Sequence, residues 1–277
     1  MKDGASKMKR LTLTAALALA LTWAGGALQA RTWYVTVAGT GDAPTIHAAL
    51  DSAVAGDSVL VGPGTYTVDT TTVIPPSVVL ISETGPTDTI IEGPWLLLLD
   101  GIAMGSGSEL NGFWVKPGTL DGVIPGSNSL VIGNIIEGGG FSLRVDQSCW
   151  IYRNLFVSGI LDIQGAPSFI FNIVMPPVIC PRNGLGGAQC NNFVGTLSGC
   201  EEILFDQSNF SMDPQFCSPE TGDYRLMASS PCAPGNHPFG RECTLIGPLG
   251  VGCAPVPTKE MSWGAVKALY SDGENEQ

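Results

Sequence analysis

Short apolar runs recur along the chain, and an asparagine stands before many of them. Asn154 precedes the apolar run 155–157, and Asn172 precedes the apolar run 173–175 in the same way. Gly, Pro and Ser are frequent between the runs, as tight turns require. Such a period of about 20 residues indicates a solenoid, in which each repeat stacks on the next. The asparagines recur at similar steps, in the order Asn111, Asn134, Asn154, Asn172 and Asn192.

Each period holds about three apolar runs, and each run is too short for a helix. Three short strands per turn describe an all-β fold, a right-handed parallel β-helix, whose inward side chains form one continuous core. An asparagine at the same turn of every coil can bond the backbone of neighbouring coils, and buried polar groups need such partners. We therefore interpret the five asparagines as a structural ladder rather than as ligand-binding groups.

A short helix is expected before the first coil. Residues 45–54 carry apolar side chains at helical spacing, and Gly56 ends the pattern. The open end of a β-solenoid exposes strand edges and core, so it needs a cover. The prediction is an N-terminal capping helix within residues 31–56, followed by the first coil from Asp57.

The N-terminal segment 1–30 differs from the repeats. Residues 1–10 contain four basic residues, and the apolar run 11–21 is too short to span a bilayer comfortably. This order is typical of a secretory signal peptide cut near Ala30, and a retained N-terminal membrane anchor is the alternative. Beyond Ala30 no apolar stretch approaches the length of a membrane-spanning helix, so no transmembrane segment is expected after signal removal.

The rest of the chain is expected to form one domain and a tail. We assign residues 31–253 to the β-helix, with a Cys-rich closing segment over about 200–253. The Pro-containing stretch 254–257 is typical of a linker, so residues 254–277 are assigned to a linker and C-terminal tail.

Eight cysteines lie between residues 149 and 253, and an even count in an exported chain suggests disulfides. No Cys-x-x-Cys pair exists, which argues against a structural zinc site. Cys149 stands apart from the others and is the candidate for a free thiol. The pairing stays open, and the disulfide candidates are Cys190, Cys200, Cys217, Cys232, Cys243 and Cys253.

The charge balance limits the classes of partner. The chain has 13 Lys and Arg against 25 Asp and Glu, for a net charge of −12. The segment 1–30 holds four of the basic residues and one acid, so its removal leaves nine against 24 and a charge of −15. Nucleic acid is therefore not an expected partner, because phosphate binding needs a basic surface. Acidic polysaccharide would also be repelled unless a cation such as calcium bridges the two.

Two segments carry a resemblance to a known group of proteins. "TIHAALDSAVAGDSVLVGPGTYT", followed by "VIPPSVVLISETGPTDTIIEG", resembles the opening of right-handed parallel β-helix proteins of the pectate-lyase-like superfamily, in secreted bacterial forms. "DPQFCSPETGDYRLMASSPCAPGNHPFGRECTLIGPLGVGC" is similar to a closing segment found in such proteins. The resemblance implies the fold and leaves the activity open, because the superfamily includes lyases, hydrolases, epimerases and adhesins.

Catalytic groups are scarce. The chain has two histidines, His47 in the expected helix and His237 in the closing segment, so the coils carry no histidine base. The Asn-Thr-Asp, Asp-Asp, Gly-His and Arg-Ile-Lys motifs of the pectin hydrolases, which the resemblance would imply, are absent. Few basic residues lie within the coils. These departures leave enzymatic activity uncertain and favour a chain that is not an enzyme.

Two sets of residues are candidate sites. An aspartate follows an apolar residue in four successive coils, and a column of such carboxylates would need a cation, so calcium is the one cofactor suggested. Turn formation is the alternative role for these residues: Asp100, Asp121, Asp146 and Asp162. A second set, Arg144, Trp150 and Tyr152, could bind sugar hydroxyls and stack on sugar rings, or pack as an ordinary surface.

The favoured function is that of a secreted or cell-surface protein, without catalysis, that binds glycans or another surface. The alternative is a calcium-dependent polysaccharide lyase or glycoside hydrolase acting on extracellular polysaccharide, with calcium at the four aspartates. A purely structural spacer is the third hypothesis.

Overall fold

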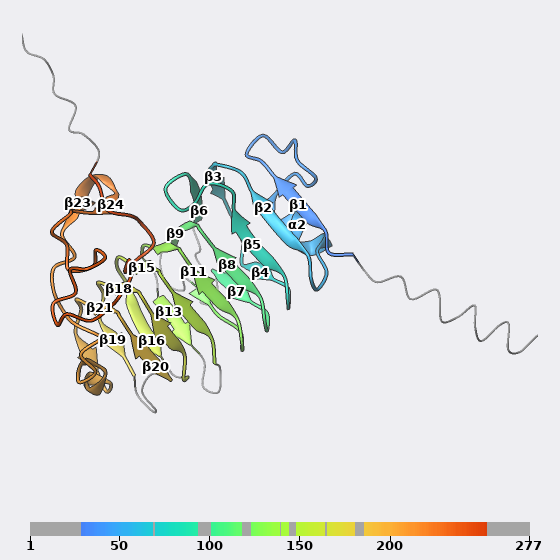
Figure 1. The fold of residues 1–277 in the computed structure, drawn as a ribbon. Helices are drawn as coiled ribbons and strands as arrows, with labels where there is room; N and C mark the ends of the chain where they lie inside the picture. Colours follow the sequence, from blue (N-terminus) through green and yellow to red (C-terminus); the bar gives the residue numbers. More distant parts are fainter. Residues whose placement is uncertain are drawn as a thin grey trace, which may run out of the picture.

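The computed structural model describes residues 29–253 except for 69, 94–100, 118–122, 139, 144–147, 164 and 181–185. Among these residues the strands wind into a parallel β-solenoid, with one short α-helix, α2, near its N-terminal end (Figure 1). The prediction of an all-β parallel β-helix is confirmed. Aspartates 100, 121 and 146 and Arg144 lie outside the described residues.

Three parallel sheets form the walls of the described solenoid, and successive coils contribute successive strands. Sheet A contains β1 Thr32–Val35, β2 Ser58–Val61, β5 Val79–Ser82, β8 Glu109–Asn111, β11 Leu130–Ile132, β14 Trp150–Tyr152, β17 Ser168–Ile170 and β20 Gly187–Gln189. Sheet B contains β3 Gly64–Thr67, β6 Thr89–Gly93, β9 Trp114–Pro117, β12 Ile135–Ile136, β15 Leu155–Phe156, β18 Ile173–Val174 and β21 Asn192–Phe193. Sheet C contains β4 Thr72–Ile74, β7 Ile102–Met104, β10 Val123–Ile124, β13 Gly140–Leu143, β16 Ile160–Ile163, β19 Val178–Ile179 and β22 Leu197–Ser198.

The alternation of side chains along each strand produces the core. Successive residues of a strand point to opposite faces, so parallel in-register strands stack equivalent positions into columns. Six consecutive residues of one inward column of sheet A are fully buried: Val59, Leu80, Leu110, Val131, Ile151 and Phe169. No single coil could bury these side chains alone, and the stacked coils share one core.

Buried asparagines connect consecutive coils along one corner. The backbone N–H of Asn134 donates to Oδ1 of Asn154 over 3.0 Å, and the N–H of Asn154 donates to Oδ1 of Asn172 over 2.8 Å. Each Nδ2 also donates to a carbonyl of the preceding coil, as Asn154 does to Val131 over 2.8 Å. The same pattern continues to the C-terminal coils, so the ladder is Asn134, Asn154, Asn172, Asn191 and Asn209.

Two asparagines predicted for the ladder lie elsewhere. Asn111 ends β8 in register with Ile132 and its Nδ2 donates to Glu109 Oε1, while Phe113 takes the ladder position. Asn192 is in register with Ile173, one residue past the ladder, and its Nδ2 donates to the Met212 carbonyl. The apolar runs alone do not reveal this, because the first strand position is apolar in β12, β15 and β18 but is Asn192 itself in β21.

Helix α2, Ile46–Ser52, forms within the segment predicted to be helical. Thr45 is its N-cap, and the Thr45 hydroxyl accepts a hydrogen bond from the Ala48 N–H over 3.1 Å. Ile46, Ala49 and Leu50 are buried and belong to the solenoid core. The helix is therefore held by one apolar face, since a helix this short is not stable alone.

The Cys-rich segment packs along the side of the solenoid as well as at its end (Figure 1). Its short helix η1, Glu201–Leu204, places Ile203 and Leu204 against the main core. The hairpin of β23 Phe216–Ser218 and β24 Asp223–Leu226, joined by the short helix η2 Pro219–Thr221, lies further on. Outward residues of sheet B are buried with this segment in a second core that includes Ile135, Leu155, Ile173, Phe210, Phe216, Tyr224, Leu226 and Ile246.

Three disulfides fasten this region: Cys180–Cys200, Cys190–Cys243 and Cys217–Cys253. The predicted set of six disulfide cysteines was wrong in including Cys232, which is a buried free thiol. Cys180 is paired in its place. Cys232 lies in the second core, where its Sγ accepts a hydrogen bond from Asn192. Cys149 is buried and free, as predicted.

Candidate ligand-binding face

The outer face of sheet A carries two columns of side chains that stack across the coils. One column runs through Leu130, Trp150, Ser168 and Gly187. The other runs through Ile132, Tyr152, Ile170 and Gln189. The in-register pairing thus brings the predicted residues Trp150 and Tyr152 onto one face, two positions apart on β14.

Trp150 stands beside a shallow hollow. Trp150, Ser168 and Gly187 occupy the same position in three successive coils, and each side chain is smaller than the one before. The small residues leave space on the sheet beside the Trp150 ring. The resulting cavity has a volume of about 390 Å³. Its lining includes the Trp150 ring, the polar side chains of Ser168, Gln189 and Asp206, and the backbone of Gly187.

Asp206 reaches this hollow from the turn that follows η1. Its Oδ1 accepts a hydrogen bond from the Ser208 N–H over 3.0 Å, which orients the carboxylate. Oδ2 has no hydrogen bond with any described residue, so it can accept from a ligand hydroxyl. The role of Asp206 is not evident from the sequence alone, because its proximity to Trp150 depends on how the closing segment folds back.

Trp150 differs from the other tryptophans whose surroundings the structure describes. The Trp33 indole N–H donates to Asp57 Oδ2, and the Trp114 indole N–H donates to Glu137 Oε2 over 2.9 Å. Both of these rings are half-buried. Trp150 is 53% exposed, and its indole N–H has no partner among the described residues. Its ring is therefore the one of the three that is open for stacking on a ligand.

Tyr152 is held more tightly than a free stacking ring. Its ring meets Phe171 edge to face at 5.5 Å, and the Arg153 guanidinium lies 5.5 Å from the Tyr152 ring centroid. Arg153 Nη2 donates to the Thr244 hydroxyl over 3.1 Å, which ties this corner to the Cys-rich segment. Tyr152 thus supports the face beside Trp150, and Arg153 is the basic residue found near it.

Of the four aspartates proposed to bind calcium, Asp162 is the one that the structure describes. Asp162 points outward from β16, and its register neighbours are Ser142 of β13 and Ile179 of β19. It therefore has no carboxylate beside it on either adjacent strand. Among the described residues no group of three or more His, Cys, Asp or Glu could hold a metal ion. Because Asp100, Asp121 and Asp146 lie outside these residues, calcium binding there stays a prediction.

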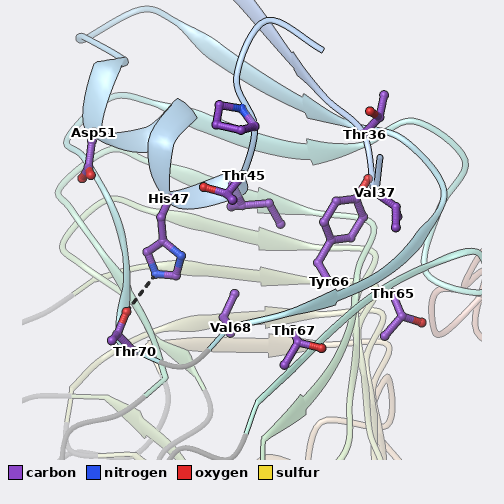
Figure 2. Close-up of a pocket in the computed structure, with 12 residues that line it drawn as sticks. Thr36, Val37, Thr45, His47, Asp51, Thr65, Tyr66, Thr67, Val68 and Thr70 are labelled. Carbon is purple, nitrogen blue, oxygen red and sulfur yellow. Dashed lines mark hydrogen bonds between the residues drawn. The ribbon is translucent and has the colours of Figure 1, made fainter. Parts of the chain in front are cut away.

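The two histidines have different surroundings. His237 is buried, its Nε2 lies 2.9 Å from the Ser208 carbonyl oxygen, and its ring packs edge to face on Phe210 at 4.9 Å. It therefore serves packing. His47 lies on α2 at the rim of a larger cavity, with its Nε2 3.4 Å from the Thr70 hydroxyl (Figure 2).

Comparison of the chain with known protein families, curated proteins and solved structures finds no match. The fold and the face of Trp150 therefore rest on this chain alone. Within the described residues, no helix is both long enough and apolar enough to cross a bilayer.

Proposed function

We propose that this chain is a secreted or cell-surface protein that binds neutral glycans on the outer face of sheet A, without cleaving them. The observation that carries the proposal is the exposed Trp150 ring beside a hollow edged by Ser168, Gln189 and Asp206. A large exposed aromatic ring next to groups that accept and donate hydrogen bonds is the combination that sugar rings require, with an apolar face and hydroxyl edges.

The charge of the hollow favours a neutral ligand. Asp206 is the charged residue in the described lining, and the chain as a whole carries a net charge of −12. An acidic polysaccharide would be repelled by both. A neutral sugar avoids this repulsion, while its hydroxyls can donate to the Asp206 carboxylate and the Gln189 amide oxygen.

The stacked strands of sheet A suit an extended ligand. Strands of sheet A follow one another at about 4.8 Å, so a chain lying across them meets equivalent side chains repeatedly. Beyond Trp150 toward the N-terminus the outer columns present Leu130 and Ile132, then Glu109 and Asn111. This face therefore offers both apolar contact and polar ends to a linear glycan.

Export and family are parts of the same proposal. Three disulfides support an oxidising compartment, since such bonds persist mainly in exported proteins. The signal-like residues 1–30 lie largely outside the described part and support export by sequence only. Membership of the pectate-lyase-like superfamily rests on the segments that resemble it. The right-handed winding rests on the repeat pattern, and the capping role of α2 rests on the need to cover the open end of the core.

Binding of defined oligosaccharides to the full chain, with its disulfides formed, tests the function. Calorimetric titration would use hexasaccharides of cellulose, xylan, mannan and starch, with polygalacturonate as the acidic comparison. We expect saturable binding to at least one neutral chain. Trp150→Ala should weaken it about tenfold or more, because a central aromatic contact typically contributes over about 1.4 kcal/mol.

Phe239→Ala is the matched control, since Phe239 is 55% exposed and lies outside the lining of the hollow. Equal losses in both variants, or no binding across the neutral panel, would contradict the proposed site. The same mixtures, with and without calcium, would be analysed by mass spectrometry. Shorter products would overturn the non-catalytic part of the proposal and direct attention to the four aspartates.

A further inference from the structure

An apolar cavity lies between the outer face of sheet B and the Cys-rich segment, apart from the Trp150 hollow. It has a volume of about 430 Å³, within the range of ligand sites. The solenoid supplies Val157 and Met175, which follow β15 and β18. The Cys-rich segment supplies the rest of the described lining: Asp213, Gln215, Phe216, Pro219, Tyr224 and Met227.

The solenoid wall of this cavity follows from the alternation of side chains. Leu155 and Val157 are two positions apart and both point outward from sheet B, and Ile173 and Met175 repeat this in the next coil. The Met175 N–H donates to the Phe156 carbonyl over 3.0 Å, which sets Met175 beside Val157. Leu155 and Ile173 are buried in the second core, whereas Val157 and Met175 are only half-buried. The cavity thus leaves two outward apolar side chains incompletely covered.

The opposite wall is built by the β23–β24 hairpin. The rings of Phe216 and Tyr224 are buried in the second core and meet edge to face at 5.4 Å. The Met227 N–H donates to the Gln215 carbonyl over 2.9 Å, which continues the pairing of the hairpin to the rim of the cavity. Met227 itself is 40% exposed. Apolar side chains therefore reach the open rim, where they face water unless something covers them.

The last described residues of the chain lie beside this cavity. The Gly252 N–H donates to the Leu226 carbonyl of β24 over 2.9 Å. Cys253 is bonded to Cys217, with 5.2 Å between the two Cα atoms, and Cys217 follows Phe216 in β23. The Cα atoms of Cys253 and Phe216 are therefore within about 9 Å of each other, since consecutive Cα atoms are about 3.8 Å apart.

The sequence that follows carries apolar side chains of the right kind. Residues 261–270, which lie outside the described part, read "MSWGAVKALY" and contain one charged residue, Lys267. Trp263, Val266 and Tyr270 follow one another at steps of three and four residues, the spacing that places side chains on one side of a helix. A segment of this kind matches an apolar cavity, because its large side chains gain by leaving water.

Charge favours this segment over the residues after it. Asp213 is the charged residue of the described lining, and its Oδ1 accepts the Gln215 N–H over 2.9 Å. The Oδ2 atom of Asp213 has no hydrogen bond with any described residue and can accept from Lys267. Residues 271–277 contain three acidic residues and no apolar one, so the acidic chain, with its net charge of −12, repels them.

The connection to Cys253 makes the chain's own segment a strong competitor for the cavity. Nine residues, 254–262, separate Cys253 from Trp263, and they can span up to about 30 Å. A short flexible linker holds its end at an effective concentration of the order of millimolar. A weak contact therefore suffices to keep the cavity filled, whereas a separate partner would need a much higher affinity.

We propose that residues 261–270 of the same chain dock in this cavity, with the Trp263 ring between sheet B and the hairpin and with Lys267 toward Asp213. Docking covers Val157, Met175 and Met227. The cavity shares no residue with the Trp150 hollow, so the proposal does not depend on glycan binding to sheet A.

Methionine methyl groups provide a direct readout, because an aromatic ring displaces the NMR signals of methyl groups near its face. In the full chain with its disulfides formed, Met175 and Met227 report on the cavity. Met104, buried in the main core, and Met212, 47% exposed and outside the lining, are references. We expect Trp263→Ala to shift the ¹³C-methyl signals of Met175 and Met227 and to leave both references in place. Phe239→Ala, which removes an exposed ring outside the lining, should shift none of the four.

Tryptic cleavage after Lys267 provides a second measurement. Docking protects this bond, so the rate follows the fraction of chains with the segment released. Trp263→Ala should raise the rate about tenfold or more, as for loss of a central aromatic contact. Met227→Gln places an amide in the apolar wall and should raise it about fivefold. Met212→Gln is the matched control and should leave the rate unchanged.

Several outcomes would overturn the proposal. Unchanged Met175 and Met227 signals in Trp263→Ala would mean that the segment does not occupy the cavity. Signals that return to their Trp263→Ala positions when the wild-type protein is diluted would mean that the segment of a second copy fills it. Equal cleavage rates in Met227→Gln and Met212→Gln would separate protection of Lys267 from this cavity.

Discussion

Asn154 and Asn172 occupy the same corner of consecutive coils, and the backbone N–H of Asn154 donates to Oδ1 of Asn172 over 2.8 Å. Both side chains are fully buried. Asn154 in turn accepts from the Asn134 backbone N–H and donates to the Val131 carbonyl. A single amide thereby satisfies backbone groups of the coils on both sides, whereas an apolar residue of similar size has neither the donor nor the acceptor.

Replacing a ladder asparagine should therefore destabilise the solenoid strongly. For Asn154→Ala we expect a loss of about 3 kcal/mol or more in the free energy of unfolding, because each orphaned buried backbone group costs about 1–3 kcal/mol. Urea denaturation measures this value. Asn111→Ala is the control, since Asn111 is half-buried and its side chain bonds only Glu109 among the described residues. The Asn111→Ala variant should lose only about 0.5 kcal/mol in the free energy of unfolding, as an ordinary surface substitution does. Equal losses would contradict the ladder as described.

The Cys190–Cys243 disulfide should hold the Cys-rich segment on sheet B. The two cysteines are 53 residues apart, and a loop of that length implies a stabilisation of about 4 kcal/mol in the chain-entropy account. Replacing both cysteines with Ala should raise amide hydrogen exchange in strands β12, β15 and β18 of sheet B, because the Cys-rich segment covers their outer face. Mass spectrometry after pepsin digestion locates the change.

A second double variant shows whether that effect is local. Cys180 and Cys200 join the last coils of sheet C, so their replacement by Ala should raise exchange mainly at β19 and β22. If both double variants produced the same exchange pattern, the disulfides would not act on separate regions.

The two free thiols should be inert in the folded protein. Burial raises the pKa of both Cys149 and Cys232 to about 12, so at pH 8 only about one thiol in ten thousand is the reactive thiolate. Iodoacetamide should therefore add nothing to the native chain. After unfolding without a reductant it should add two groups per chain, one at each free cysteine. Peptide mass spectrometry distinguishes this from any other disulfide count, and rapid labelling of native Cys232 would contradict its burial.

Asp57 should contribute stability that is lost in acid. The N–H groups of Arg31 and Val54 and the Trp33 indole donate to its carboxylate, and these bonds lower the pKa of Asp57 below its ordinary value. A carboxyl with a lowered folded-state pKa stabilises the fold above its unfolded pKa, and this contribution disappears as pH falls below about 4. Thermal unfolding of Asp57→Asn should show a lower Tm at pH 6 and a smaller drop between pH 6 and pH 3.

The control for this experiment is the exposed Asp88, whose side chain makes no hydrogen bond with a described residue. Asp88→Asn should keep the wild-type pH dependence. If the Tm of Asp57→Asn fell between pH 6 and pH 3 by as much as the wild-type Tm, other carboxyls would account for the acid sensitivity.

Much of the fold follows from local sequence patterns. A period of about 20 residues, three short apolar runs per period and a helical pattern over residues 45–54 each depend on neighbours in the chain, and they correctly predicted the parallel β-helix and α2. Cys149 as a free thiol could also be anticipated from its distance to the other cysteines.

Other features were decided by contacts between distant segments. Asn191 and Asn192 are adjacent and alike in sequence, and only the register of β18 with β21 places one in the ladder and the other against Met212. The pairing of Cys180 with Cys200, rather than any pairing of Cys232, depends on how the Cys-rich segment turns back.

The candidate sites show the same division. The sequence by itself determined that Trp150 and Tyr152 share a face, because alternation along a strand is local. Only the tertiary structure decided that Trp150 is open while Tyr152 is packed by Phe171, and that Asp206 borders the hollow. It also decided that His47 and Tyr66 border one cavity. The physical reason is that a local pattern encodes which side of a strand is buried, whereas the partner it meets there depends on stacking between coils.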